Sequence, residues 1–146
     1  MEKLEKGDKI ALIAPSAQIG SIEKIQKGLD FLHSCGFETV FAPHLFAVRR
    51  YMAGTDKERA ADVEWAFSQA DVKAVLCVRA AAGAARILPY LNYDLIKKFP
   101  KPLIGFCDNA ALMLALYKNS GLVSWNGFLP TYDFRDESLN PLVKDS

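Results

Sequence analysis

The sequence contains few of the residues that form metal, disulfide or nucleic-acid-binding sites. It has only two histidines, and its three cysteines, Cys35, Cys77 and Cys107, lack the spacing of metal ligands. We therefore expect no metal ion or cofactor, and free thiols in a reducing cytoplasm rather than a disulfide framework. Eighteen basic residues balance seventeen acidic ones, without a basic stripe. This balance argues against nucleic acid as a partner.

Long hydrophobic runs are missing as well. No apolar stretch approaches the roughly 18 residues that a transmembrane helix needs, so we expect no membrane partner. The charged start, residues 1–7, lacks the apolar core of a signal peptide, which agrees with a cytoplasmic location. A chain of 146 residues suits one domain, which we assign to residues 1–130. Residues 131–146 are rich in charge and form the expected polar tail.

Short apolar runs do occur, and they alternate with helical patterns. Runs of strand length cover residues 10–14, 38–42, 73–78, 103–106 and 122–125. The alternation predicts an α/β fold, with three α/β/α layers around a mostly parallel sheet of about five strands. Right-handed crossovers bring the carboxyl ends of parallel strands to one edge. The loops after Ala14, Val78 and Phe106 should therefore meet in one candidate site.

Several helix boundaries can also be read from the sequence. Thr55 and Glu58 are spaced as a capping box, which predicts a helix to about residue 68. Ser21 is expected to cap an earlier helix, and Gly36 to end it. Residues 110–116 are apolar on every side, so we expect that helix to lie inside the protein.

Cys107 stands between the apolar run 103–106 and this helix, on a predicted strand–turn–helix elbow. Asp108 and Asn109 suit the start of the helix. Such an elbow can present a nucleophile, with the next backbone N–H donating to an oxyanion. A free cysteine is equally often a small buried apolar residue. The residues alone leave both interpretations open.

Four segments together resemble one known family. They are Lys6–Ile10 leading to Ala14-Pro15-Ser16, Tyr51–Asp62 (YMAGTDKERAAD), Gly83–Pro89 (GAARILP), and Ser120–Val123 (SGLV). With the Lys101–Phe106 approach to the elbow, they are similar to the N-terminal part of the LD-carboxypeptidase family, which includes the microcin C self-immunity peptidases. The resemblance covers roughly residues 6 to 129.

The resemblance implies a serine peptidase of two domains. The N-terminal α/β domain carries the nucleophile on the elbow. A C-terminal domain, which we do not find in this sequence, carries the glutamate and histidine of the triad. Family members work in the cytoplasm on murein tetrapeptides or related peptides, cutting the bond between an L-residue and D-alanine, and they pair as dimers. By resemblance we expect a murein-type peptide as ligand and a homodimer.

The family's site maps onto two segments of this chain. Cys107 holds the nucleophile position, and the N–H groups of Asp108 and of Ala81 or its neighbour hold the oxyanion position. The loop that contains Arg79, Ala80, Ala82 and Gly83, together with Arg86, is expected to bind the substrate. For the two arginines, a structural ion pair or a helix-end charge is an equally good interpretation.

Three departures from the family bear on activity. Cysteine replaces serine, and a thiol acts only as thiolate. The family's R-G-G-Y-G loop is Arg79-Ala-Ala-Ala-Gly83 here, and its H-G-P is Asn126-Gly127-Phe128. Neither His33 nor His44 is expected beside the thiol, so the nucleophile lacks a base and the chain should be inactive or nearly so. It could be a fragment of the nucleophile domain, a degenerate relative that binds or self-associates without cutting, or a partner for a chain that supplies the missing residues.

Overall fold

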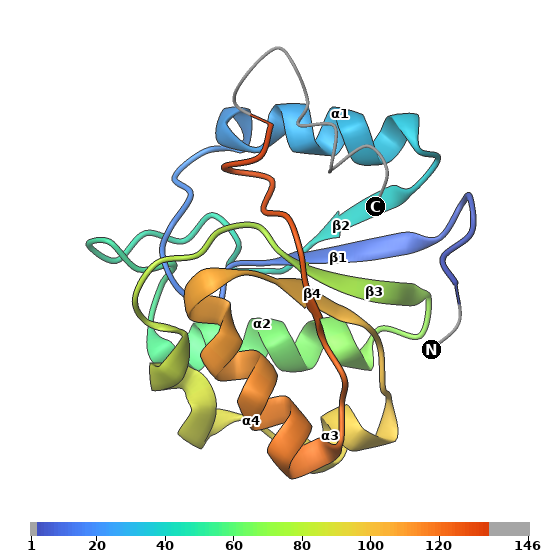
Figure 1. Ribbon diagram of the computed structural model, residues 1–146. Coiled ribbons are helices and arrows are strands. Elements are labelled where there is room, and N and C mark those ends of the chain that lie inside the picture. The colour runs from blue at the N-terminus through green and yellow to red at the C-terminus, as the bar shows by residue number, and fades with distance from the viewer. Residues whose placement is uncertain (1–2, 135–146) are drawn as a thin grey trace.

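The computed structural model describes residues 3–134, which fold around a five-stranded parallel sheet (Figure 1). The strands are β1 (Lys9–Ile13), β2 (Glu38–Phe41), β3 (Val72–Cys77), β4 (Leu103–Gly105) and β5 (Trp125–Asn126). Their order is β2-β1-β3-β4-β5, and every neighbouring pair is parallel. The predicted α/β fold with a mostly parallel sheet is confirmed. The chain turns to opposite sides of β1 to form β2 and β3, and the crevice at such a switch point is where open α/β sheets bind ligands.

Helices cover both faces of the sheet. The short 3-10 helix η1 (Ile22–Lys24) and α1 (Gln26–Ser34) lie over one face, above the sheet in Figure 1. The other face is covered by α2 (Asp56–Ser68), η2 (Ala84–Tyr90), α3 (Tyr93–Lys98) and α4 (Ala110–Ser120), the last preceded by the single turn η3 (Cys107–Asn109). Alternate residues of β1 enter the two cores, with Ile10 and Leu12 packing toward α1 and Ala11 and Ile13 toward α2. None of the helices in residues 3–134 has the length and hydropathy to span a membrane.

Two of the predicted helix ends are confirmed and one is not. Thr55 accepts from the N–H of Glu58 at 3.2 Å, and Glu58 accepts from the N–H of Thr55 at 2.7 Å, which completes the capping box of α2. Gly36 follows α1 in the left-handed region, with φ of 92°. Ser21 precedes η1 without a side-chain cap, because the chain first forms that short 3-10 turn and α1 begins only at Gln26.

The segment after β5 crosses the sheet edge toward α1 (Figure 1). The ring of Phe134 lies 5.1 Å from that of Phe31 and 5.7 Å from that of Phe128, centroid to centroid. Pro130 packs so closely on α1 that a Cβ added at Gly28 would lie 2.8 Å from the Cβ of Pro130. Thr131 and Phe134 are buried, so residues 131–134 pack on the domain. The rest of the expected polar tail, 135–146, lies outside the described residues.

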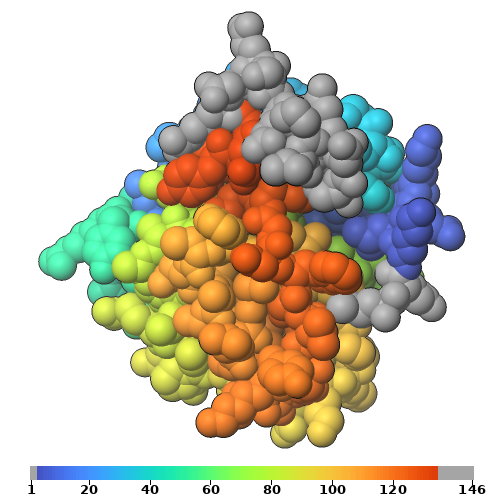
Figure 2. All heavy atoms as spheres, in the orientation of Figure 1, coloured from blue at the N-terminus to red at the C-terminus, as the bar shows by residue number. Residues whose placement is uncertain are grey.

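The prediction that the helix after the elbow lies inside the protein is wrong. Leu112 and Leu116 of α4 are fully buried, whereas Leu114 is 68% and Tyr117 is 61% exposed. Only one stripe of the helix packs against the sheet, and the rest faces outward (Figure 2). The fifth strand starts at Trp125, later than the predicted residues 122–125. Leu122 packs in the hydrophobic core first, and the chain pairs with β4 only after it.

Candidate active site

Cys107 is held at a sharp elbow between β4 and α4. Its φ is 56°, a left-handed value that only one other non-glycine residue, Arg50, shares among residues 3–134. This conformation costs an L-residue about 1–2 kcal/mol. The helix start approaches the strand closely, since a Cβ at Gly105 would lie 3.0 Å from the Cβ of Asn109. Cys107 is exposed, so its thiol is not part of the core and the interpretation as a buried apolar residue is wrong, while the nucleophile role stays a prediction.

The elbow also presents backbone donors. The first hydrogen bond of η3 runs from the N–H of Asn109 to the carbonyl of Phe106, at 3.2 Å. The N–H groups of Cys107 and Asp108 come before it, so neither has an acceptor within the helix. Donors of this kind beside a nucleophile can stabilise an oxyanion.

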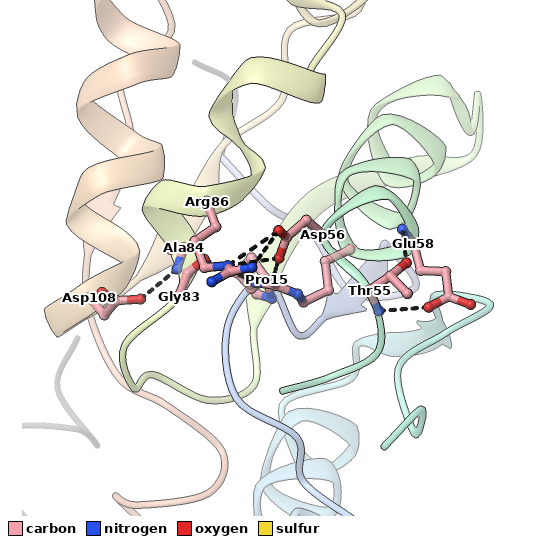
Figure 3. Close-up of polar contacts among 9 residues, drawn as sticks. Pro15, Thr55, Asp56, Glu58, Gly83, Ala84, Arg86 and Asp108 are labelled. Carbon is pink, nitrogen blue, oxygen red and sulfur yellow. Dashed lines mark hydrogen bonds and ion pairs between the residues drawn. The ribbon is translucent and has the colours of Figure 1, made fainter. Parts of the chain in front are cut away.

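The loop after β3 is fixed directly against the elbow. The amide of Asn109 donates to the carbonyl of Arg79 at 3.3 Å, and the N–H of Ala84 donates to the carboxylate of Asp108 at 2.8 Å (Figure 3). Ser16, after β1, donates from its hydroxyl to the same Arg79 carbonyl at 3.4 Å. The loops after β1, β3 and β4 therefore meet at one edge, as the topology predicted. Asp108 and Asn109 do not cap α4, because both side chains bind this neighbouring loop instead.

A buried arginine joins the same loops from the α2 side. Arg59, 1% exposed, donates from Nη1 to the carbonyls of Pro15 at 2.7 Å and Gly83 at 3.0 Å, and its guanidinium pairs with Asp56. Burial lowers the pKa of Arg59, against the opposing effect of Asp56. Sequence reasoning assigned Arg59 no role, although it is the arginine of the quoted Tyr51–Asp62 segment.

Both arginines of the predicted site have partners within the protein. Arg86 binds the carboxylate of Asp56 through Nε, at 3.1 Å, and Nη2, at 2.9 Å (Figure 3). Its side chain is nevertheless 62% exposed. Arg79 donates from Nη1 to the carbonyl of Gln18 at 2.9 Å, and its buried Nε has no partner. The structural ion pair that we held open for these residues is thus present at Arg86.

The small residues of the loop differ in accessibility. Ala80 is buried, with its carbonyl accepting from the hydroxyl of Tyr132 at 3.3 Å. Ala81 is half-buried and Ala82 exposed. Gly83 has a φ of 140°, a conformation that L side chains rarely adopt, so this position favours glycine. The structure places Ala80, Ala81, Ala82 and Gly83 on the segment that contacts the elbow.

Neither His33 nor His44 forms a hydrogen bond with the thiol of Cys107, because each binds a different residue. His33 contacts the hydroxyl of Thr39 at 3.0 Å through Nε2, and His44 contacts the carboxylate of Asp62 at 2.8 Å through Nδ1. Thr39 lies in β2, which is separated from β4 by two strands, β1 and β3. Burial raises the pKa of Asp62, and the hydrogen bond from His44 opposes the shift. Among residues 3–134 there is also no group of three potential metal ligands.

Comparison with known proteins identifies the family to which this arrangement belongs. Residues 10–127 match the model of the LD-carboxypeptidase N-terminal domain, peptidase family S66. The chain is a member of the LD-carboxypeptidase family. The match includes the elbow, the Arg79–Gly83 loop and the α2 capping box, and confirms the family that the sequence motifs indicated.

Curated relatives and solved structures agree with this membership. The chain is 35% identical over 143 residues to the probable murein peptide carboxypeptidase of Bacillus subtilis, covering 98% of this chain and 44% of the relative. It is 34% identical over 124 residues to the murein tetrapeptide carboxypeptidase of Pseudomonas aeruginosa, covering 84% and 40%. The structure of the microcin C7 self-immunity protein MccF, known from Escherichia coli, superposes with a TM-score of 0.88 at 28% identity, covering 97% and 42%. The chain thus spans about two fifths of the length of these relatives.

Proposed function

We propose that this domain is the nucleophile-bearing part of a cytoplasmic enzyme that hydrolyses the L,D-peptide bond of murein tetrapeptides, and that it is inactive or nearly so without further residues. The observation that carries the proposal is the exposed thiol of Cys107, held at positive φ where three loops converge. This is the geometry in which elbows present nucleophiles. The names of the relatives point to murein peptides as the substrate class.

The chain's own residues would act in distinct ways. The sulfur of Cys107 attacks the carbonyl carbon before the D-residue, and the N–H groups of Asp108 and of Ala81 or its neighbour receive the oxyanion. Arg79, Ala82 and Gly83 line the peptide from the loop that also contains the buried Ala80, and Arg86 follows in η2. Attack requires a thiolate, and protonation of the departing amine requires an acid. Since both histidines are engaged elsewhere, we assign base and acid to a glutamate and a histidine outside residues 3–134, in a further domain or a second chain.

Peptide binding can be tested independently of turnover. The chain is incubated with a synthetic murein tetrapeptide while iodoacetamide alkylates its thiols, and released D-alanine is measured in parallel. We expect the peptide to slow alkylation of Cys107 without slowing that of the half-buried Cys35, and to yield little or no D-alanine. Any release should disappear in Cys107→Ala. Equal alkylation of Cys107 with and without peptide, together with no release, would contradict the proposal.

A second candidate function is a non-catalytic module that assembles through an apolar face. Leu114 and Tyr117 of α4 are exposed, and so are Val123 and Trp125 after it, by 56% and 58%. These segments share one face of the molecule (Figure 2). Exposed apolar groups of this kind mark association sites, and a homodimer is the simplest product. Sedimentation velocity should show a concentration-dependent dimer that Leu114→Asp weakens. A monomer at the highest concentration would exclude this function.

A further inference from the structure

A cavity lined by arginines lies beside the start of α2. Its volume is about 340 Å³, and its walls include Arg49, Arg50, Tyr51, Asp56 and Arg86. Three guanidinium groups thus share the cavity with one carboxylate. We propose that this arginine cavity binds a carboxylate group of the peptide substrate. That the carboxylate belongs to a murein peptide rests on the proposed function, whereas carboxylate binding itself does not.

The single carboxylate in the wall is already engaged. Asp56 receives hydrogen bonds from Arg86 and Arg59, and these partners lower its pKa. Glu58, just outside the wall, accepts from the N–H of Thr55, and that bond and the charges of His44 and Arg49 lower its pKa. Asp56 and Glu58, the acids around the cavity, therefore already have hydrogen-bond partners at the start of α2 and in η2.

Arg49 and Arg50 have no such partner. Both side chains are exposed, and neither forms an ion pair in the part of the chain that the structure describes. A guanidinium group presents its donors in a planar fork that matches both oxygens of a carboxylate. Tyr51, 59% exposed, adds an aromatic surface beside them. The cavity therefore presents two guanidinium groups, of Arg49 and Arg50, that form no ion pair among the described residues and can bind an anion.

The backbone of Arg50 has a strained, positive φ, and its exposed side chain gains no packing in the core. Arg49 and Met52 exchange two backbone hydrogen bonds, of 2.9 and 3.1 Å, so Arg50 and Tyr51 form a two-residue turn. Arg50 has a φ of 58° at the first central position, where such turns favour glycine. Strained residues of this kind concentrate at ligand sites. An exposed arginine where the turn favours glycine supports a binding role.

The cavity is connected to the elbow by a short series of contacts. Arg86 holds Asp56, Asp56 pairs with Arg59, and Arg59 holds the carbonyl of Gly83. The adjacent residue Ala84 donates to Asp108, beside the thiol. Figure 3 shows Asp108, Gly83, Arg86, Asp56 and Thr55 following one another along this edge. A peptide whose scissile bond lies at the elbow can therefore extend toward the arginine cavity.

Backbone amide shifts of the full chain, followed by NMR, test the inference. The probes are glutarate, a synthetic murein tetrapeptide, and the same tetrapeptide with its carboxyl groups amidated. We expect glutarate and the acidic tetrapeptide to shift the amides of Arg50 and Tyr51, and amidation to weaken tetrapeptide binding about tenfold or more. Arg49→Gln with Arg50→Gln should weaken both acidic probes by a similar factor. Lys97→Gln with Lys118→Gln, which removes the same charge from two exposed helical sites, should change affinity less than about twofold.

Arg50→Gly separates binding from folding. Glycine relieves the positive φ, so the melting temperature should stay the same or rise while affinity for glutarate falls at least about threefold. A lower melting temperature with unchanged affinity would show a structural role and overturn the inference. Equal binding of the acidic and amidated tetrapeptides would overturn it as well, and so would equal losses in the arginine and lysine double variants.

The two proposals fail in different ways. If glutarate shifts Arg50 and Tyr51 but the tetrapeptide leaves the amides of Asp108 and Asn109 unmoved, the arginine cavity stands and the proposed peptidase function is wrong. If the tetrapeptide shifts the elbow amides but not those of Arg50 and Tyr51, the cavity inference is wrong and the function stands.

Discussion

The carboxylate of Asp108 accepts a 2.8 Å hydrogen bond from the backbone N–H of Ala84, which fastens the elbow to the start of η2. A bond to a charged acceptor is worth about 1.5–3 kcal/mol when its donor would otherwise be left unsatisfied. This contact therefore determines how closely the Arg79–Gly83 loop is held to the thiol.

We expect Asp108→Ala to lower the free energy of unfolding by about 1–2 kcal/mol and to accelerate hydrogen exchange at the Ala84 amide. Chemical denaturation and NMR exchange measure the two effects. Asp108→Asn, which keeps an acceptor oxygen, should recover most of the loss. If the Ala84 amide exchanged as slowly in Asp108→Ala as in wild type, the hydrogen bond between Asp108 and Ala84 would not be what holds the loop.

The three cysteines should differ in reactivity because their surroundings differ. Cys107 is exposed, Cys35 is half-buried, and Cys77 is fully buried in β3, where burial raises the pKa of its thiol. Since the thiolate is the reactive form, iodoacetamide should modify Cys107 first, Cys35 more slowly, and Cys77 only after unfolding. Peptide mass spectrometry after timed alkylation follows each site, and Cys107→Ser should remove only the fastest phase. Early modification of Cys77 in folded protein would contradict the packing described for β3.

Arg59 and Arg86 share Asp56 as a partner but differ in burial, so their loss should have unequal costs. Arg59, 1% exposed, donates to two carbonyls that Arg59→Met would leave without this donor, so the variant should destabilise the fold by about 3 kcal/mol or more. Arg86→Met removes a largely exposed ion pair and should cost less than about 1 kcal/mol. Urea unfolding of the two variants measures the difference. Equal losses would contradict the assignment of Arg59 as the group that joins the loops.

The sequence predicted the features of this fold that depend on local pattern. Apolar runs between helical segments gave the parallel sheet, and the spacing of Thr55 and Glu58 gave the cap of α2. The meeting of three loops followed from the handedness of crossovers, without any knowledge of side-chain contacts. The strands, the helices and the cap each repeat or close within a few residues, which is why periodicity and spacing reveal them.

The features that were missed depend on partners distant in sequence. Asp108 was expected to cap its own helix but binds Ala84, 24 residues away, and Arg59 reaches Pro15 across 44 residues. The exposed half of α4 was expected to be buried, because an apolar helix composition does not specify what covers each face. The positive φ at Cys107 has no sequence signal, since glycine does not stand there.

Acid should weaken the domain partly through Asp56. Its hydrogen bond from Arg86, together with the charge of Arg59, lowers the pKa of this carboxyl below the unfolded value of about 3.9. Between the two pKa values the unfolded chain binds more protons than the folded one, so the free energy of unfolding rises with pH there. The stabilisation is complete above the unfolded pKa and is lost as pH falls through the folded pKa.

We therefore expect Asp56→Asn to lower stability by about 1 kcal/mol at pH 7, or roughly 2–4 °C in melting temperature, and to differ less from wild type as pH falls below about 3.9. Asp30→Asn, at an exposed α1 carboxylate that accepts from the neutral amide of Gln26, serves as the control and should stay within about 0.5 kcal/mol of wild type at pH 7. Thermal melts of the three proteins between pH 7 and pH 2 make the comparison. A constant gap between Asp56→Asn and wild type over this range would mean that the asparagine variant loses packing rather than charge. In that case Arg59 would hold the carbonyls of Pro15 and Gly83 without help from the carboxylate of Asp56.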